Sequence, residues 1–188
     1  MLLQRSGKNI KAVIRGDAMD LKEKIRNIPD FPKPGILFRD ITTLLKDAPA
    51  FRSVIDALAD RYAHTPIDLI AGIESRGFIF GAALACQLSR GFVPIRKPGK
   101  LPAKTVSAEY SLEYGTDRIE MHVDAVQGGA RVLLIDDLLA TGGTMQAACE
   151  LVRKAGGCVA ECAFIIELAG LQGRDKIKDQ TVFSMIQY

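Results

Sequence analysis

The sequence lacks three features that would each point to a specialised class of protein. It has no apolar run of about 18 residues, so no membrane span is expected. It has no large excess of charge of one sign, since the net charge is only +3 over 188 residues. A protein dedicated to nucleic acid usually carries a clustered basic face, so neither nucleic acid nor a membrane is expected as a partner. Residues 1–18 also lack the apolar core of a secretory signal.

Cysteine is scarce, with four in the chain, and no set of cysteines and histidines has the spacing of a zinc site. Two of the four lie in apolar helical patterns and two in an expected strand: Cys86, Cys149, Cys158 and Cys162. We therefore expect buried free thiols, without disulfides, in a protein of the reducing cytoplasm.

The remaining composition is ordinary for a globular protein, with 48% apolar and 25% charged residues. The length allows one domain with a sizeable core. Residues 1–18 carry four basic side chains against one acid, and a second methionine stands at position 19. We expect residues 1–18 to be a poorly ordered extension and residues 19–188 to form a single folded domain.

Residues 131–144 carry the clearest chemical signal. Residues 132–135 are continuously apolar, as in a strand covered on both faces of its sheet, and Asp136 and Asp137 stand where that strand should end. A turn of alanine, threonine and glycine follows at residues 140–144, and apolar residues then repeat at helical spacing from Met145. The predicted order is strand, acidic pair, small turn and helix N-terminus.

This order suits a phosphorylated sugar. The first turn of a helix offers unpaired N–H groups and partial positive charge, which together bind phosphate. Gly142 and Gly143 let the backbone approach an anion closely, while ionised Asp136 and Asp137 accept hydrogen bonds from sugar hydroxyls or a hydrated cation. Taken singly, the acids fit a solvated strand end and the glycines fit a tight turn. The spacing matches neither a Walker loop nor a dinucleotide fingerprint.

A second turn of this kind follows an expected strand at residues 67–73. It reads Glu-Ser-Arg-Gly at positions 74–77 and leads into an apolar helix that runs to about Leu88. The planar guanidinium of Arg76 suits phosphate oxygens, although alone it fits a surface ion pair equally well. With two such turns in one chain, we expect Arg76 to bind a diphosphate.

The other expected elements alternate between strands and helices. A helix with Asp20 as its N-cap covers residues 21–28, a further helix begins after Pro49, and strands cover residues 92–95, 158–168 and 181–186. A basic loop from Arg96 to Ser107 brings Lys97 and Lys100 toward a polyanion, and a hairpin follows up to Val123. The pattern predicts an α/β fold with a mostly parallel sheet flanked by helices, its ligand lying at the carboxyl ends of the strands.

Two segments resemble a known family. Residues 132–144 resemble the phosphoribosyl-diphosphate motif of the type I phosphoribosyltransferases, with four apolar residues, two acids and the Thr-Gly-Gly-Thr turn. Residues 31–41 resemble the Phe-Pro-x-Pro-Gly-x-x-Phe-Arg-Asp-Ile stretch of the adenine phosphoribosyltransferases, although by composition alone they would be a connecting loop. The likeness runs from about Leu21 to the C-terminus.

The resemblance implies the type I phosphoribosyltransferase fold, with a small hood at about residues 21–45 and a flexible loop and hairpin at about residues 97–123. It implies purine salvage, in which adenine and phosphoribosyl diphosphate give AMP and diphosphate. It also implies Mg2+ held mainly by the diphosphate and water rather than by protein ligands, and a homodimer in which Arg96 reaches into the neighbouring site.

The resemblance also assigns roles to residues. Phe38 would stack on the base while the backbone of its neighbours reads the adenine edge, and Glu113 would handle the base proton. The expected catalytic residues are Arg76, Glu113, Asp136 and Asp137. The expected substrate-binding residues are Leu37, Phe38, Arg39, Glu74, Ser75, Gly77, Arg96, Lys97, Lys100, Tyr114, Ala140, Thr141, Gly142, Gly143 and Thr144.

Two other functions stay open at this point. One is a phosphoribosyltransferase that acts on another purine. The other is a non-catalytic regulator that binds phosphoribosyl diphosphate, but such a regulator usually carries an added DNA-binding domain, and residues 1–18 are too short for one.

Overall fold

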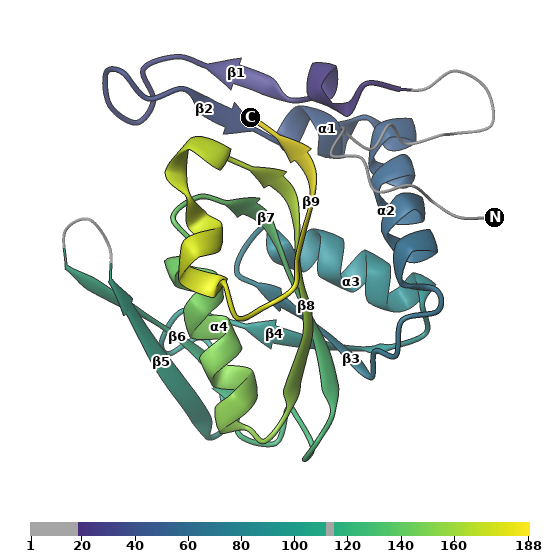
Figure 1. Cartoon of the computed structure of the whole chain (residues 1–188), viewed down its shortest axis with the longest axis vertical. Helices are drawn as coiled ribbons and strands as arrows, with labels where there is room; N and C mark the ends of the chain where they lie inside the picture. Colours follow the sequence, from purple (N-terminus) through teal and green to yellow (C-terminus); the bar gives the residue numbers. More distant parts are fainter. Residues whose placement is uncertain (1–18, 112–114) are drawn as a thin grey trace.

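A five-stranded parallel sheet lies at the centre of the chain, in a computed structural model that describes residues 19–111 and 115–188 (Figure 1). The strand order is β4-β3-β7-β8-β9. The strands are β3 (Leu69–Ile73), β4 (Gly91–Ile95), β7 (Arg131–Leu139), β8 (Cys158–Glu167) and β9 (Val182–Gln187). The predicted fold class is therefore confirmed. The expected extension at residues 1–18 lies outside the described residues, as do Glu113 and Tyr114.

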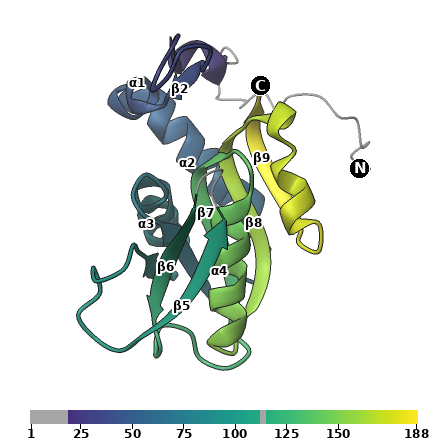
Figure 2. The ribbon, with the colours of Figure 1, turned by 90° about the vertical axis from the view of Figure 1, so that its left-hand side faces the viewer.

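Helices cover both faces of this sheet, and β7 therefore has apolar side chains on both of its faces. Leu133 and Ile135 pack with α2 (Ala48–Tyr62) and α3 (Gly77–Gln87), whereas Val132 and Leu134 pack with α4 (Gly143–Lys154). Successive strand residues point to opposite faces, so covering both faces requires the continuous apolar run that the sequence shows. Figure 2 shows α4 and α3 on the two sides of the sheet.

The predicted hairpin is confirmed as β5 (Thr105–Ser111) and β6 (Thr116–His122). It packs on the α4 side through Ala108, Ile119 and Met121, which are all nearly fully buried. Because β5 already begins at Thr105, the basic loop after β4 is shorter than the predicted stretch from Arg96 to Ser107.

A small layer above the carboxyl ends of the strands contains a short helix, two strands and α1 (Thr42–Lys46), and we refer to residues 21–46 as the hood (Figure 1). The predicted helix over residues 21–28 is too long. A single 3-10 turn, Leu21–Lys24, is capped by Asp20, whose Oδ1 accepts from Lys22 N at 2.9 Å. The chain then becomes β1 (Arg26–Ile28), because it pairs with β2 (Phe38–Asp40).

The connection from β8 to β9 holds two 3-10 turns, Ala169–Leu171 and Gly173–Ile177. All four cysteines are free, as expected. The expectation of burial is confirmed for Cys149 and Cys162 but wrong for Cys86 and Cys158, which are exposed. Cys86 follows buried Ala85 near the end of α3, and Cys158 is the first residue of β8.

No helix within residues 19–111 and 115–188 combines the length and apolar character that crossing a membrane requires.

Candidate functional site

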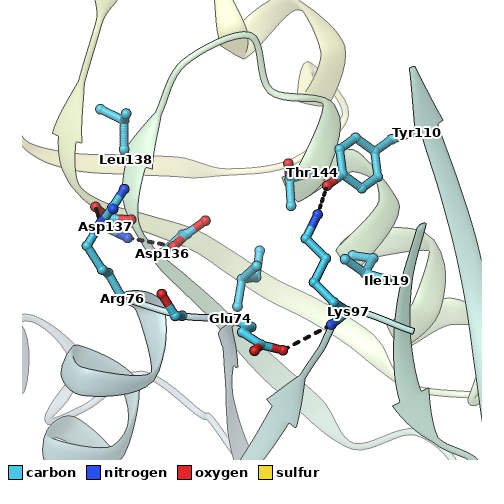
Figure 3. A pocket seen from close by; sticks show the side chains of 11 residues that line it. Glu74, Arg76, Lys97, Tyr110, Ile119, Asp136, Asp137, Leu138 and Thr144 are labelled. Atoms are coloured by element: carbon cyan, nitrogen blue, oxygen red, sulfur yellow. Dashed lines mark hydrogen bonds and ion pairs between the residues drawn. The ribbon is translucent and has the colours of Figure 1, made fainter. Parts of the chain in front are cut away.

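Two neighbouring cavities lie at the carboxyl ends of β3 and β7. The larger has a volume of about 280 Å³ and is lined by both predicted motifs (Figure 3). The smaller, of about 70 Å³, is lined by all of residues 140–144. Three residues border both cavities, namely Asp136, Leu138 and Thr144. Two turns more than 60 positions apart in the sequence thus form one continuous site.

The acidic pair lies inside β7 rather than after it. The strand continues to Leu139, and its pairing with β8 includes Asp136 opposite Phe164 and Leu139 opposite Glu167. The predicted strand end at Ile135 is therefore wrong, because the longer neighbour β8 supplies backbone partners beyond the apolar run. This pairing fixes the backbone of Asp136 and Asp137 within the sheet.

Arg76 and Asp137 join the two motifs directly. The Nε of Arg76 donates to Oδ2 of Asp137 at 2.5 Å. Asp137 is 7% exposed, whereas the Arg76 side chain is 42% exposed. Within the described residues the two terminal nitrogens of Arg76 have no hydrogen-bond partner, so the outer edge of its guanidinium remains available to an anion.

Asp136 sits beneath the first residue of α3. Its Oδ1 accepts from the backbone N–H of Asp137 at 2.8 Å. A Cβ on Gly77 would lie 2.9 Å from that same oxygen and 2.8 Å from the carbonyl of Ile135, so only glycine fits there. Burial, followed by the charge of Asp137, raises the pKa of Asp136 well above its usual range, and Arg76 partly opposes that rise.

Glu74 anchors the turn at residues 74–77, which leads into α3 beside the larger cavity. The peptide bond from Glu74 to Ser75 is cis. The Glu74 carboxylate accepts from Nε and Nη2 of Arg96, each at 3.1 Å, and from the backbone N–H of Lys97 at 3.1 Å. Hydrogen bonds from Arg96 therefore hold the pKa of Glu74 below its usual value. These contacts, which all lie within one chain, fix the start of the basic loop at Arg96 and Lys97.

Lys97 reaches the larger cavity from that loop. Its Nζ donates to the hydroxyl of Tyr110 at 2.7 Å and forms an ion pair with Asp117. Tyr110 and Asp117 face each other across the hairpin and are joined by a 3.0 Å hydrogen bond (Figure 3 shows Tyr110 beside Lys97). Lys100, by contrast, borders neither cavity and is exposed.

Tyr110 and Asp117 are functional candidates that the sequence reasoning did not single out. The alternating pattern placed Tyr110 on a strand, but alternation does not reveal which strand residue meets Lys97. The hairpin register, which pairs Tyr110 with Asp117, is given by the structure and not by the sequence pattern.

The small turn of the second cavity depends on Gly142. This residue has a φ of 81°, in the left-handed region that favours glycine, and it stands directly before the first residue of α4. A Cβ on Gly142 would also overlap the carbonyl oxygen of Gly173 and come within 3.1 Å of its carbonyl carbon. The turn therefore directs the N-terminus of α4, a helix of 12 residues, toward the cavity.

The predicted base-binding segment lies in the hood and borders neither cavity. Phe38 is half-buried and packs edge-on against Phe31, with ring centroids 5.2 Å apart. The guanidinium of Arg39 lies 3.8 Å from the ring centre of Tyr188, while Leu37 is 46% exposed. The hood therefore directly contacts the residue that follows β9.

The described residues contain no group of three or more histidine, cysteine, aspartate or glutamate side chains arranged to hold a metal. Magnesium accepts a different arrangement, in which one or two carboxylates, substrate phosphates and water supply the oxygens. Asp136 and Asp137 meet that requirement at the larger cavity.

The chain is similar in sequence and in fold to proteins of one known family. A family model described as phosphoribosyl transferase domain matches residues 41–188. An adenine phosphoribosyltransferase of Chloroflexus aurantiacus is 63% identical over 169 residues, covering 90% of this chain and 98% of that protein. The crystal structure of the Thermoanaerobacter pseudethanolicus adenine phosphoribosyltransferase is 55% identical with a TM-score of 0.87, covering 89% and 98% of the two chains.

A further solved relative carries ligands. The adenine phosphoribosyltransferase of Saccharomyces cerevisiae was crystallised with D-2,5-dideoxy-2,5-imino-altritol 1,6-bisphosphate and adenine. It is 41% identical with a TM-score of 0.83, and the match covers 88% of this chain and 96% of that one.

Proposed function

The chain belongs to the phosphoribosyl transferase domain family, among its adenine phosphoribosyltransferases, and we propose that its two adjoining cavities bind the two ends of 5-phosphoribosyl 1-diphosphate. The protein is an enzyme of purine salvage: it transfers the phosphoribosyl group to adenine and releases AMP and diphosphate. The observation that carries the site assignment is the meeting of two anion-binding turns at the carboxyl ends of neighbouring strands.

The 5-phosphate is assigned to residues 140–144. Backbone N–H groups of the first α4 turn and the hydroxyls of Thr141 and Thr144 donate to its oxygens. Asp136 and Asp137 then accept hydrogen bonds from the ribose hydroxyls, because both border the larger cavity next to this turn. Their negative charge favours the cationic sugar that develops as the diphosphate leaves.

The diphosphate is assigned to the opposite wall of the larger cavity. Arg76 keeps Nε on Asp137 and offers its terminal nitrogens to phosphate oxygens, while the backbone of Ser75 and Gly77 approaches from the same turn. Lys97 adds a second cation at this wall. Lys100 borders neither cavity in this structure and would add a third when the loop moves over the site. Magnesium, held mainly by the diphosphate and water, supplies further charge neutralisation when bound.

The base is assigned to the hood. Phe38 stacks on the adenine ring, and the backbone of Leu37 and Arg39 discriminates an amino group from a carbonyl. Glu113 exchanges the base proton, and Tyr114 contributes to substrate binding; both belong to the segment between the described ranges. Movement of the loop and hairpin at about residues 97–123 over the site excludes water, which would otherwise hydrolyse the activated sugar.

The working enzyme is proposed to be a cytoplasmic homodimer in which each subunit is one domain from residue 19 to residue 188. Arg96 is the candidate for contact with the neighbouring site, in addition to its ion pair with Glu74.

The test is an assay of purified protein with phosphoribosyl diphosphate, magnesium and each of adenine, hypoxanthine, guanine and xanthine. We expect AMP from adenine and much slower nucleotide formation from the three 6-oxopurines. Equal or faster use of a 6-oxopurine would move the assignment to another purine. Binding of phosphoribosyl diphosphate without any turnover would support the alternative of a non-catalytic regulator.

A further inference from the structure

The small turn at residues 140–144 is backed by the connection between β8 and β9. A Cβ on Gly173 would overlap the carbonyl oxygen of Ala140 and lie 2.9 Å from Cδ1 of Leu139. A Cβ on Gly142 would in turn overlap the carbonyl oxygen of Gly173. The two backbones therefore touch with no room for a methyl group between them.

Glycine at position 173 is needed for space rather than for backbone freedom. Its φ is outside the left-handed region, unlike that of Gly142. Gly170 provides a contrast in the same connection, because a Cβ there would meet nothing within 4 Å. One glycine of this connection thus contacts the turn and the other does not.

Arg174 fixes Gly173 to the sheet. Its Nε and Nη2 donate to the two carboxylate oxygens of Glu167, each at 2.7 Å, and its Nη1 donates to the carbonyl of Val182 at 3.2 Å. Glu167 is the last residue of β8 and is only 5% exposed. Gln187 and Ser184 on β9 also donate to this carboxylate.

These contacts form a continuous mechanical link from the sheet to the turn. The ends of β8 and β9 hold Arg174, Arg174 holds Gly173, and Gly173 supports Ala140 and Gly142 from behind. A further hydrogen bond, from Leu168 N to the carbonyl of Leu139 at 2.9 Å, ties the start of the connection to the end of β7. The turn therefore has a rigid support on the side away from the cavity.

We propose that Gly173 and Arg174 are positioning residues for the sugar 5-phosphate. They touch no substrate. They hold the backbone N–H groups of residues 140–144 at the geometry that a phosphate needs, and a displacement of about 1 Å in such a shell costs much of its binding. This inference rests on the proposed assignment of the 5-phosphate to that turn.

The test compares Gly173→Ala with Gly170→Ala, which adds the same methyl group in open space. The measurements are the KM for phosphoribosyl diphosphate, the KM for adenine, and the inhibition constants of ribose 5-phosphate and inorganic diphosphate. For Gly173→Ala we expect about a tenfold or greater weakening for the two ligands that carry a 5-phosphate, since one charge-assisted contact is worth about that much. Adenine and inorganic diphosphate should stay within about twofold, and Gly170→Ala should match the wild type.

A second pair of variants covers the case in which Gly173→Ala does not fold. Arg174→Lys keeps the charge but loses the two-pronged contact with Glu167. Its control, Arg153→Lys, alters an exposed ion pair with Asp179 at the end of α4. Arg174→Lys should weaken the binding of ribose 5-phosphate by about threefold or more without changing the KM for adenine. Arg153→Lys should change neither the binding of ribose 5-phosphate nor the KM for adenine.

The outcomes distinguish a failure of the proposed function from a failure of the positioning role. Wild-type protein that makes no AMP from adenine and phosphoribosyl diphosphate would refute the proposed function itself. An active wild type would leave that function standing. In that case the positioning role is overturned if folded Gly173→Ala and Arg174→Lys bind ribose 5-phosphate normally. It is also overturned if both variants bind phosphoribosyl diphosphate, adenine, ribose 5-phosphate and inorganic diphosphate more weakly by the same factor, as a general structural defect would produce.

Discussion

Replacing Arg76 with alanine should impair the enzyme in two separable ways. The side chain donates to Asp137 at 2.5 Å and, in the proposed complex, also contacts the diphosphate. A hydrogen bond between charged groups contributes about 1.5–3 kcal/mol, and each 1.36 kcal/mol in a barrier is a factor of ten. We therefore expect kcat/KM to fall by about tenfold to about a hundredfold.

The same substitution should change the dependence of the rate on pH. The positive charge of Arg76 lowers the pKa of Asp136, which burial and the charge of Asp137 otherwise raise. Without Arg76 the pKa of Asp136 rises further, so the ionised form is lost at a higher pH. The acidic limb of the kcat/KM profile should accordingly move to higher pH, and the defect should be larger at pH 6 than at pH 9.

The matched control is Arg76→Lys, which keeps a cation beside Asp137 but lacks the planar fork. Its acidic limb should stay close to that of the wild type while its rate falls. The assay is the initial rate of AMP formation between pH 5.5 and pH 9.5, together with the thermal midpoint of each variant. A wild-type rate in Arg76→Ala, or an unmoved acidic limb in a folded, slower variant, would refute the linkage between Arg76 and the acidic pair.

Three further substitutions test other parts of the site and the fold. Asp137→Asn removes the charge that pairs with Arg76 and should cut turnover by at least about tenfold, so unchanged steady-state kinetics would exclude its role. Glu113→Gln should lower kcat by a larger factor than it weakens the binding of phosphoribosyl diphosphate. A loss of affinity for phosphoribosyl diphosphate with unchanged kcat would count against a proton-transfer role. Hydrogen bonds from Arg174, Ser184 and Gln187 lower the pKa of Glu167 from 4.5 to about 2, so its stabilisation is complete above pH 4.5 and is lost as the pH falls toward 2. Urea unfolding of Glu167→Gln should therefore show a deficit of up to about 3 kcal/mol at pH 7 that disappears at low pH, and a deficit independent of pH would contradict this.

The sequence was sufficient to predict the sheet and the two glycine-containing turns that line the cavities, because their signals are local. A strand covered on both faces must be apolar throughout, as residues 132–135 are. A helix that begins where another backbone segment lies very close needs glycine at or just before its first residue, and Gly77 and Gly142 occupy such positions. Such constraints act on neighbouring residues and can be read without the fold.

The hood was harder to predict because its structure depends on distant pairing. Leu21, Ile25 and Ile28 have helical spacing, yet Ile28 lies in β1, since it pairs with Phe38 ten residues away. The strand that carries Asp136 and Asp137 also continues past its apolar run, because β8 extends beside it.

The support behind the small turn was invisible in the sequence for the same reason. Gly173 looks like a linker residue, and only the fold places it against Ala140. Lys97 borders the larger cavity. Its contacts with Tyr110 and Asp117 follow from the hairpin register, which alternation alone does not give.

A crystal structure of the protein with phosphoribosyl diphosphate and magnesium tests the central assignment most directly. The 5-phosphate should lie against residues 140–144, the ribose hydroxyls should lie within hydrogen-bond distance of Asp136 and Asp137, and the diphosphate should contact Arg76 and Lys97. A sugar bound in the reverse orientation, or bound outside both cavities, would contradict the account.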